Sequence, residues 1–289
     1  MQDKGLVSVI IPTWNRERDL AHAIRSALTQ TYRNLEVLVC DDGSTDTSRD
    51  LVEQIGDARV RWIEGAHAGL PSVPRNRGMR AARGEWIAFM DSDDTWLEDK
   101  LARQLVRMSA AGGMPRASCG NALRRIGPES PAPDAPLLLA QTEDTELPLS
   151  DLMQSNSVVT STVVLHRSLL PAIGEFPTSR GLKVGEDYAY WLRAASLTPF
   201  AFHGAALASY ADIPAASVRA SVRNETLAKL RVYRDYFGWL SVSYPHRLAT
   251  VLPLCLFLES RNALLRRWWR LRNRLGLLRR RLFPQGRQR

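Results

Sequence analysis

Short apolar runs alternate with helix-like segments through the first 115 residues, and this alternation constrains the fold more than any other feature. The runs cover residues 6–11, 35–40, 60–63 and 86–90. Apolar residues four apart mark the helix expected after the first run, with Asn15 as its N-cap. Continuous apolar runs are typical of strands buried on both faces. The alternation predicts an α/β fold with a doubly wound, mostly parallel sheet and helices on both faces.

The pattern is less regular in the second half of the chain. A proline-rich stretch at 127–136 predicts a loop. The β-branched run 158–165 predicts a strand, and 186–195 predicts a helix.

The positive charge is concentrated at the C-terminus. The formal net charge is +9, but eleven of the 39 basic residues are arginines in residues 261–289, which contain no acid. The rest of the chain holds 28 basic and 30 acidic residues, so no basic groove for nucleic acid is expected.

The same C-terminal segment has the spacing of an amphipathic helix. Its apolar residues lie alternately four and three positions apart: Leu264, Trp268, Leu271, Leu275, Leu278 and Leu282. A basic amphipathic helix suits an anionic membrane surface. A helix docked on the body of the protein, or a coiled-coil partner, is the alternative.

Cysteine content and hydropathy bear on location. The three cysteines are few and far apart in the sequence, which favours a reducing compartment. The N-terminus lacks the features of a secretory signal, and the longest apolar run, 251–258, is far shorter than the ~20 residues of a membrane span. We expect a cytoplasmic protein, peripheral on the inner face of the cell membrane.

Polar residues follow three of the four predicted strands. Pro12 ends the first strand, Asp42 follows the second, and Asp91, Ser92 and Asp93 follow the fourth. Ligands of doubly wound sheets bind beyond the carboxyl ends of the strands, so these residues should share one rim. Asp91 and Asp93 offer the hard oxygen ligands that Mg²⁺ or Mn²⁺ prefers. The simpler alternative is an acidic turn that caps the next helix.

Two other carboxylate sites admit both a functional and a structural explanation. Asp42 can accept hydrogen bonds from uracil or ribose, or it forms only an Asx turn that opens the next helix. Glu186 and Asp187 begin a predicted helix, where they complement the helix dipole. One of them could instead remove the proton from an acceptor hydroxyl as a general base.

Four segments, in this order, resemble family 2 glycosyltransferases. They are SVIIPTWNR, VCDDGSTD, RNRG followed by ARGEWIAFMDSDD, and GEDYAYWLR, between about residues 7 and 193. Each motif alone is weak, but four in the right order are specific. The resemblance implies a GT-A fold and an inverting transfer from a nucleotide-sugar, UDP-linked by family habit. The acceptor would be a hydroxyl of a saccharide or lipid-linked substrate in cell-surface polysaccharide synthesis.

The resemblance also implies a role for each matching residue. Asp42 would contact the nucleoside and Asp91 the ribose side, with Ser92 beside it. Asp93 would bind the Mn²⁺ or Mg²⁺ that bridges the two phosphates. Asp187 would be the catalytic base, with Glu186 the less favoured choice. The nucleotide pocket would also be lined by Pro12 and Arg75.

The same resemblance divides the chain into three parts. Residues 1–115 would be the nucleotide-sugar-binding half of the GT-A domain, and 116–215 the acceptor-binding half. Residues 216–289 would be a C-terminal helical region.

Three other functions fit parts of the sequence. WIAFMDSDDT matches the D-x-D-x-T motif of haloacid dehalogenase-type phosphatases, in which Asp91 would be the nucleophile. Two strand–helix units precede that motif here, whereas it normally lies near the start of such a domain. A sugar nucleotidyltransferase would need a glycine-rich loop after the first strand, which is missing. A catalytically inactive sugar-nucleotide binding module is the third alternative.

Overall fold

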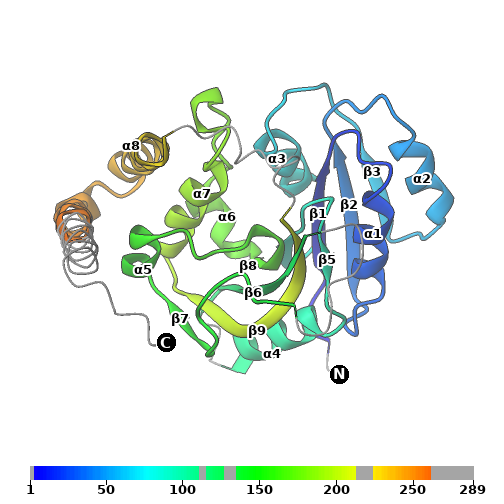
Figure 1. The fold of residues 1–289 in the computed structure, drawn as a ribbon, viewed down its shortest axis with the longest axis horizontal. Helices are drawn as coiled ribbons and strands as arrows, with labels where there is room; N and C mark the ends of the chain where they lie inside the picture. Colours follow the sequence, from blue (N-terminus) through cyan, green and yellow to red (C-terminus); the bar gives the residue numbers. More distant parts are fainter. Residues whose placement is uncertain (1–2, 111–114, 127–134, 213–223, 262–289) are drawn as a thin grey trace, which may run out of the picture.

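The computed structural model describes residues 3–110, 115–126, 135–212 and 224–261. In these ranges nine strands form one sheet, and helices cover both of its faces (Figure 1). The strands are β1 (Val7–Thr13), β2 (Leu35–Asp41), β3 (Val60–Ile63), β4 (Trp86–Phe89), β5 (Thr95–Trp96), β6 (Ala117–Arg125), β7 (Thr145–Leu147), β8 (Val164–His166) and β9 (Phe200–Ala211).

Eight α-helices have labels in the described ranges, together with three short 3-10 turns. The helices are α1 (Leu20–Leu28), α2 (Ser48–Ile55), α3 (Ser72–Ala81), α4 (Lys100–Ala110), α5 (Leu149–Gln154), α6 (Leu170–Ile173), α7 (Glu186–Ala195) and α8 (Glu225–Ser243). The turns are η1 (Thr160–Thr162), η2 (Arg167–Leu169) and η3 (Arg180–Leu182).

The strand order places the N-terminal half at one side of the sheet. The order is β3-β2-β1-β4-β8-β6-β9-β5, and β7 pairs with β9. β3, β2, β1 and β4 are all parallel, as the strand–helix alternation predicts. β8 then runs antiparallel to β4 and to β6, whereas β6 and β9 are parallel. The sheet is therefore parallel in its first half and mixed in its second.

Alternate residues of the central strands point to opposite faces of the sheet and pack into two hydrophobic cores. Val9 and Val37 pack with α1 and α4 on one face. Ile10 and Leu38 pack with α3 and α7 on the other face. Both faces of the strands are buried because helices cover both, which confirms the predicted α/β class.

Two local sequence predictions are wrong. Residues 158–165 do not form one strand: η1 occupies their centre, and β8 begins only at Val164. The reason is local, because the Thr162 hydroxyl donates to the Val159 carbonyl and stabilises a turn in place of a ladder. Asn15 does not cap α1, whose N-cap is Asp19. Asn15 instead adopts φ +50° and accepts a hydrogen bond from the Thr45 amide.

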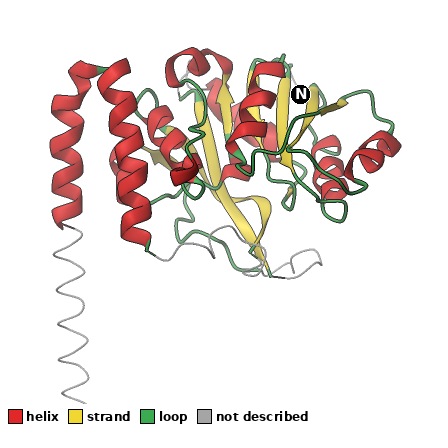
Figure 2. Cartoon of the chain, turned by 90° about the horizontal axis from the view of Figure 1, so that it is seen from above, coloured by secondary structure: helices red, strands yellow, loops and turns green. Residues whose placement is uncertain are grey.

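Two helical segments end the described chain. α8 packs against α7 through Val232 and Tyr236. Residues 245–261 are also helical and lie beside α8 (Figure 2). No described helix is both long enough and apolar enough to cross a membrane. Most of the predicted amphipathic segment, 262–289, and most of the predicted proline-rich loop, 127–134, lie outside the described residues.

Candidate active site

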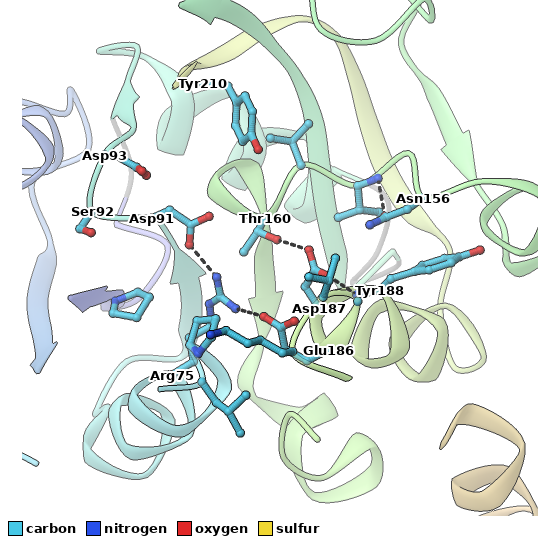
Figure 3. Close-up of a pocket in the computed structure, with 18 of the residues that line it drawn as sticks. Arg75, Asp91, Ser92, Asp93, Asn156, Thr160, Glu186, Asp187, Tyr188 and Tyr210 are labelled. Atoms are coloured by element: carbon cyan, nitrogen blue, oxygen red, sulfur yellow. Dashed lines mark hydrogen bonds and ion pairs between the residues drawn. The ribbon is translucent and has the colours of Figure 1, made fainter. Parts of the chain in front are cut away.

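A cavity of about 1060 Å³ opens at the carboxyl ends of β1, β2 and β4, bounded by α7 and α8 on its other side (Figure 3). It is lined by every residue that the sequence motifs single out: Pro12, Asp42, Arg75, Asp91, Ser92, Asp93, Glu186 and Asp187. The structure thus brings together residues separated by up to 175 positions in the chain.

The acidic turn after β4 presents its carboxylates in different directions. Asp94 is buried and accepts hydrogen bonds from the Ser161 hydroxyl and from the Ala211 amide at 2.8 Å. Asp93 is partly exposed to the cavity and lies 3.3 Å from Arg16 Nη2. Burial and the neighbouring Asp91 carboxylate raise the pKa of Asp93, while Arg16 opposes this. α4 begins only at Lys100, so the turn does not cap a helix.

Arg75 is buried between two carboxylates. Its Nη2 donates to Asp91 Oδ1 at 2.6 Å, and its Nη1 donates to Glu186 Oε1 at 3.0 Å. Figure 3 shows the guanidinium between these two side chains, one from the turn after β4 and the other from the start of α7. Burial disfavours the charged guanidinium, but the surrounding carboxylates outweigh burial and raise the pKa of Arg75.

Glu186 and Asp187 occupy the first turn of α7 but have different surroundings. Glu186 is buried, and burial together with the Asp187 carboxylate raises its pKa to about 7 in spite of Arg75. Asp187 is only half-buried, and its Oδ2 accepts a hydrogen bond from the Thr160 hydroxyl at 3.1 Å. Of the two, Asp187 is the more accessible to a substrate in the cavity.

Asp41 and Asp42, at the end of β2, accept hydrogen bonds from different loops. Asp41, not Asp42, makes the Asx turn, because its carboxylate accepts from the Gly43 and Ser44 amides. The Asp42 carboxylate accepts from the amides of Ala68 and Gly69 at 3.0 and 2.9 Å. It thereby fixes a loop at the edge of the cavity.

That loop carries an aromatic stack. The His67 ring stacks on Trp14, with ring centroids 4.6 Å apart. Trp14 is half exposed, and both rings line the cavity. This end of the cavity therefore combines a carboxylate with a flat aromatic surface.

Sequence reasoning missed several residues of the site, among them His67 in the aromatic stack. Arg16, which pairs with Asp93, lies inside the SVIIPTWNR motif and could have been found there. Thr160 and Ser161 contact carboxylates of the site but lie in a segment expected to be a strand. No sequence signal distinguishes their hydroxyls from those of other strand residues.

The described residues fit a divalent cation only in part. Nowhere in the described ranges do three His, Cys, Asp or Glu side chains gather as a metal site. Asp93 offers one partly exposed carboxylate that already faces a cation, the Arg16 guanidinium. Such a site suits an ion held mainly by substrate phosphates, as Mg²⁺ commonly is.

Similarity to known proteins agrees with this geometry. Residues 8–133 match the profile of Glycosyl transferase family 2. By this match, that part of the chain belongs to the family 2 glycosyltransferases. The enzyme is 28% identical over 261 residues to UDP-Glc:alpha-D-GlcNAc-diphosphoundecaprenol beta-1,3-glucosyltransferase WfaP from Escherichia coli. That similarity covers 90% of this chain and 95% of WfaP.

Solved glycosyltransferase structures share the fold of this enzyme. S. aureus TarS 1-349 in complex with UDP-GlcNAc superposes with a TM-score of 0.61 at 19% identity, covering 84% of this chain and 75% of TarS. The mannosyltransferase PcManGT from Pyrobaculum calidifontis, in complex with GDP-Man and Mn²⁺, gives a TM-score of 0.52 at 17% identity. It covers 97% of this chain and 88% of PcManGT. The predicted GT-A architecture is confirmed, and the family match favours glycosyl transfer over the phosphatase alternative.

Proposed function

We propose that this glycosyltransferase moves a sugar from a UDP-linked donor to a hydroxyl of a lipid-linked saccharide, with inversion at the anomeric carbon. The proposed setting is cell-surface polysaccharide synthesis. WfaP, whose name gives a UDP-glucose donor and a diphosphoundecaprenol-linked acceptor, is similar along nearly its whole length and supports this choice. The TarS complex with UDP-GlcNAc supports a UDP-sugar as donor.

One observation supports the proposal most strongly: the acidic turn after β4 and the start of α7 line a single cavity. A transferase needs a place for the leaving nucleoside diphosphate and a base near the acceptor hydroxyl. The turn offers carboxylates for the first, and the half-buried Asp187 offers one for the second.

On the donor side, we assign the nucleoside to the end of the cavity that holds Asp42. Asp91 would face the ribose through Oδ2, for which the described protein provides no hydrogen-bond donor. Ser92 and Pro12 would border the nucleotide, and Arg75 would act indirectly by fixing Asp91.

Asp93 is the residue that we propose for Mn²⁺ or Mg²⁺. Its carboxylate, which now faces Arg16, would hold the ion together with oxygens of the substrate. A divalent ion bound there neutralises the charge that develops on the departing diphosphate.

On the acceptor side, Asp187 would take the proton of the attacking hydroxyl. The Thr160 hydroxyl holds one of its oxygens, so the carboxylate keeps a fixed orientation. A single displacement that uses a single base inverts the anomeric centre, whereas retaining glycosidases use a second carboxylate as nucleophile. Glu186 is the poorer choice because it is buried and bound to Arg75.

The proposed acceptor also gives a role to the remaining parts of the chain. Residues 1–115 would bind the donor and 116–215 the acceptor. In the C-terminal region 216–289, the arginine-rich residues 261–289 would hold the enzyme peripherally on the inner, anionic face of the membrane. A lipid-linked acceptor would then be within reach.

The test combines a substrate panel with two substitutions. Incubation with UDP-, GDP- and dTDP-sugars, Mn²⁺ and a GlcNAc-diphospho-lipid acceptor should release UDP and not inorganic phosphate. Asp187→Asn should lower kcat by about 10²–10⁴-fold and leave donor affinity unchanged. Asp93→Ala should abolish metal-dependent donor binding.

Asp99→Asn is a control, because within the described ranges that exposed carboxylate pairs with Arg103 alone, outside the cavity. A folded Asp93→Ala protein with the turnover of the wild type would contradict the metal assignment. Loss of donor binding in Asp187→Asn would move Asp187 to the nucleotide site.

A further inference from the structure

Thr160, the first residue of η1, lines the cavity, and Ser161 and Thr162 follow it in the same turn. Thr160, Ser161 and Thr162 are all buried. The turn leads directly into β8, which pairs with β4, so it lies beside the acidic turn that follows β4. The two groups of carboxylates come from β4 and from α7, and η1 contacts both.

Ser161 contacts the donor side at two points. Its hydroxyl oxygen accepts a hydrogen bond from the Asp91 amide at 3.0 Å. The same hydroxyl donates to Asp94 Oδ2, while Asp94 Oδ1 accepts from the Ala211 amide. One hydroxyl therefore contacts both ends of the acidic turn, and Asp93, whose carbonyl also accepts from Arg125, lies between them.

Thr160, the preceding residue, contacts the acceptor side. Its hydroxyl donates to Asp187 Oδ2 at 3.1 Å, as Figure 3 shows. A hydroxyl has a single proton to donate. Thr160 donates its proton to Asp187 on α7, whereas Ser161 donates its proton to Asp94 in the acidic turn.

The backbone of η1 is itself held in place. The Trp96 indole Nε1 donates to the Ser161 carbonyl at 2.6 Å. The Thr162 hydroxyl accepts from the Gly120 amide at 3.0 Å and donates to the Val159 carbonyl at 2.7 Å. Thr162 thus anchors the turn to β6 without contacting either group of carboxylates.

We propose that Thr160 and Ser161 are positioning residues that hold the acceptor base and the donor-binding turn at a fixed separation. Ser161 sets the donor turn and Thr160 orients Asp187, so two adjacent side chains serve the two substrates separately. This inference rests on the proposed glycosyl transfer, because it assigns Asp187 and the acidic turn to opposite partners of that reaction.

Conservative substitutions separate the two roles. Thr160→Val keeps the shape and removes the donor to Asp187, so kcat should fall by roughly 10- to 100-fold at unchanged donor Kd. Thr160→Ser restores the hydroxyl and should recover most of the lost kcat. Ser161→Ala should raise the Kd for UDP with Mn²⁺ by roughly 10-fold.

Thr162→Val is the matched control, because it removes a hydroxyl from the same turn without touching a carboxylate. Because Thr162 anchors the whole turn, this variant should lower Tm and should not reproduce the split between kcat and donor Kd that separates the other two variants. Three results would overturn the inference: equal losses of kcat and donor affinity in both variants, no loss in either, or failure of Thr160→Ser to recover kcat. A wild-type enzyme that transfers no sugar would instead overturn the proposed function itself.

Discussion

At the scale of single residues, Arg75 links the turn after β4 to the start of α7. Its side chain is 5% exposed and binds Asp91 and Glu186 together. Arg75→Met would leave a buried carboxylate without its counter-charge. Removing one partner of a buried pair costs about 3–5 kcal/mol, so we expect a loss of this size in the free energy of unfolding, measured with urea.

Arg80→Met provides the comparison on the same helix. Arg80 pairs with Glu175, but the two side chains are 63% and 47% exposed. Exposed pairs contribute less than about 1 kcal/mol. Equal losses in the Arg75 and Arg80 variants would contradict the view that the buried bridge stabilises this part of the fold.

Glu186 should make stability depend on pH. Its pKa is about 7 in the folded protein, against an ordinary value of 4.5. As pH rises from about 4.5 to 7, the unfolded chain releases this proton before the folded one does, so stability falls. The free energy of unfolding of Glu186→Gln should not fall in this way. Relative to the wild type it should therefore rise by on the order of 3 kcal/mol across that range.

Urea midpoints of both proteins at pH 5, 6, 7 and 8 measure this effect. Glu175→Gln, which changes an exposed carboxylate, is the control, and its plot of urea midpoint against pH should run parallel to that of the wild type. If the Glu186→Gln curve also runs parallel to the wild type, burial does not keep Glu186 protonated.

Residue types at strand ends were more predictable than their contacts. The sequence placed Asp42 and Asp91 on one rim because strand ends converge, and the cavity confirms that convergence. Asp187, at the start of a helix, was assigned to the site only by the resemblance to family 2 glycosyltransferases. The sequence could not assign the Asx turn to Asp41 over Asp42, because both follow the same strand. Their distinct tasks depend on the loop at Ala68 and Gly69, which lies 26 residues further on. The individual roles of the site residues remain predictions.

At the scale of elements, the junction between η3 and α7 depends on Gly185. It adopts φ +108°, and a Cβ there would lie 2.7 Å from Val232 Cγ2 on α8. Gly185→Ala should destabilise the protein by roughly 1–3 kcal/mol through backbone strain, with a further loss from the clash. Because Glu186 and Asp187 follow directly, kcat should fall as well.

Two comparisons isolate the clash. Gly56→Ala has a similar backbone requirement, at φ +65°, but its nearest neighbour would be 3.9 Å away. In a Val232→Ala background, which lacks the group that Cβ would strike, the further loss on Gly185→Ala should be smaller than in the wild type. If Gly185→Ala and Gly56→Ala give equal Tm losses, α8 does not constrain this junction.

Elements with a clear period were predicted well, and those governed by side-chain hydrogen bonds were not. The four parallel strands and α7 lie where their apolar patterns place them. The run 158–165 has strand composition, yet its threonine and serine hydroxyls bond to carboxylates and backbone that are distant in sequence. Composition alone contains no information about those partners.

At the scale of the whole molecule, the arginines of 261–289 give the chain its positive charge. If this segment holds the enzyme on an anionic bilayer, truncation after Ser260 should release it from anionic vesicles. Transfer to a soluble acceptor should be spared. Each arginine near the surface contributes about 1 kcal/mol, and salt screens that part. Buried apolar side chains should keep some binding at high salt.

Sedimentation with phosphatidylglycerol vesicles at two salt concentrations measures this, with phosphatidylcholine vesicles as the control. A melting curve for the truncated protein distinguishes the alternative. A segment docked on the body predicts no vesicle binding by the full chain and a lower Tm after truncation.

The bridge from Arg75 to Glu186 also limits how this enzyme can be recombined with its relatives. A chimera joined near residue 115 would place the Arg75 guanidinium against whatever residue another chain carries at the position of Glu186. The sheet crosses the same junction, since β4 pairs with β8 and β5 with β9. The two parts of the chain on either side of that junction therefore cannot be exchanged as independent modules. A functional hybrid must inherit the arginine and its two carboxylates as one unit.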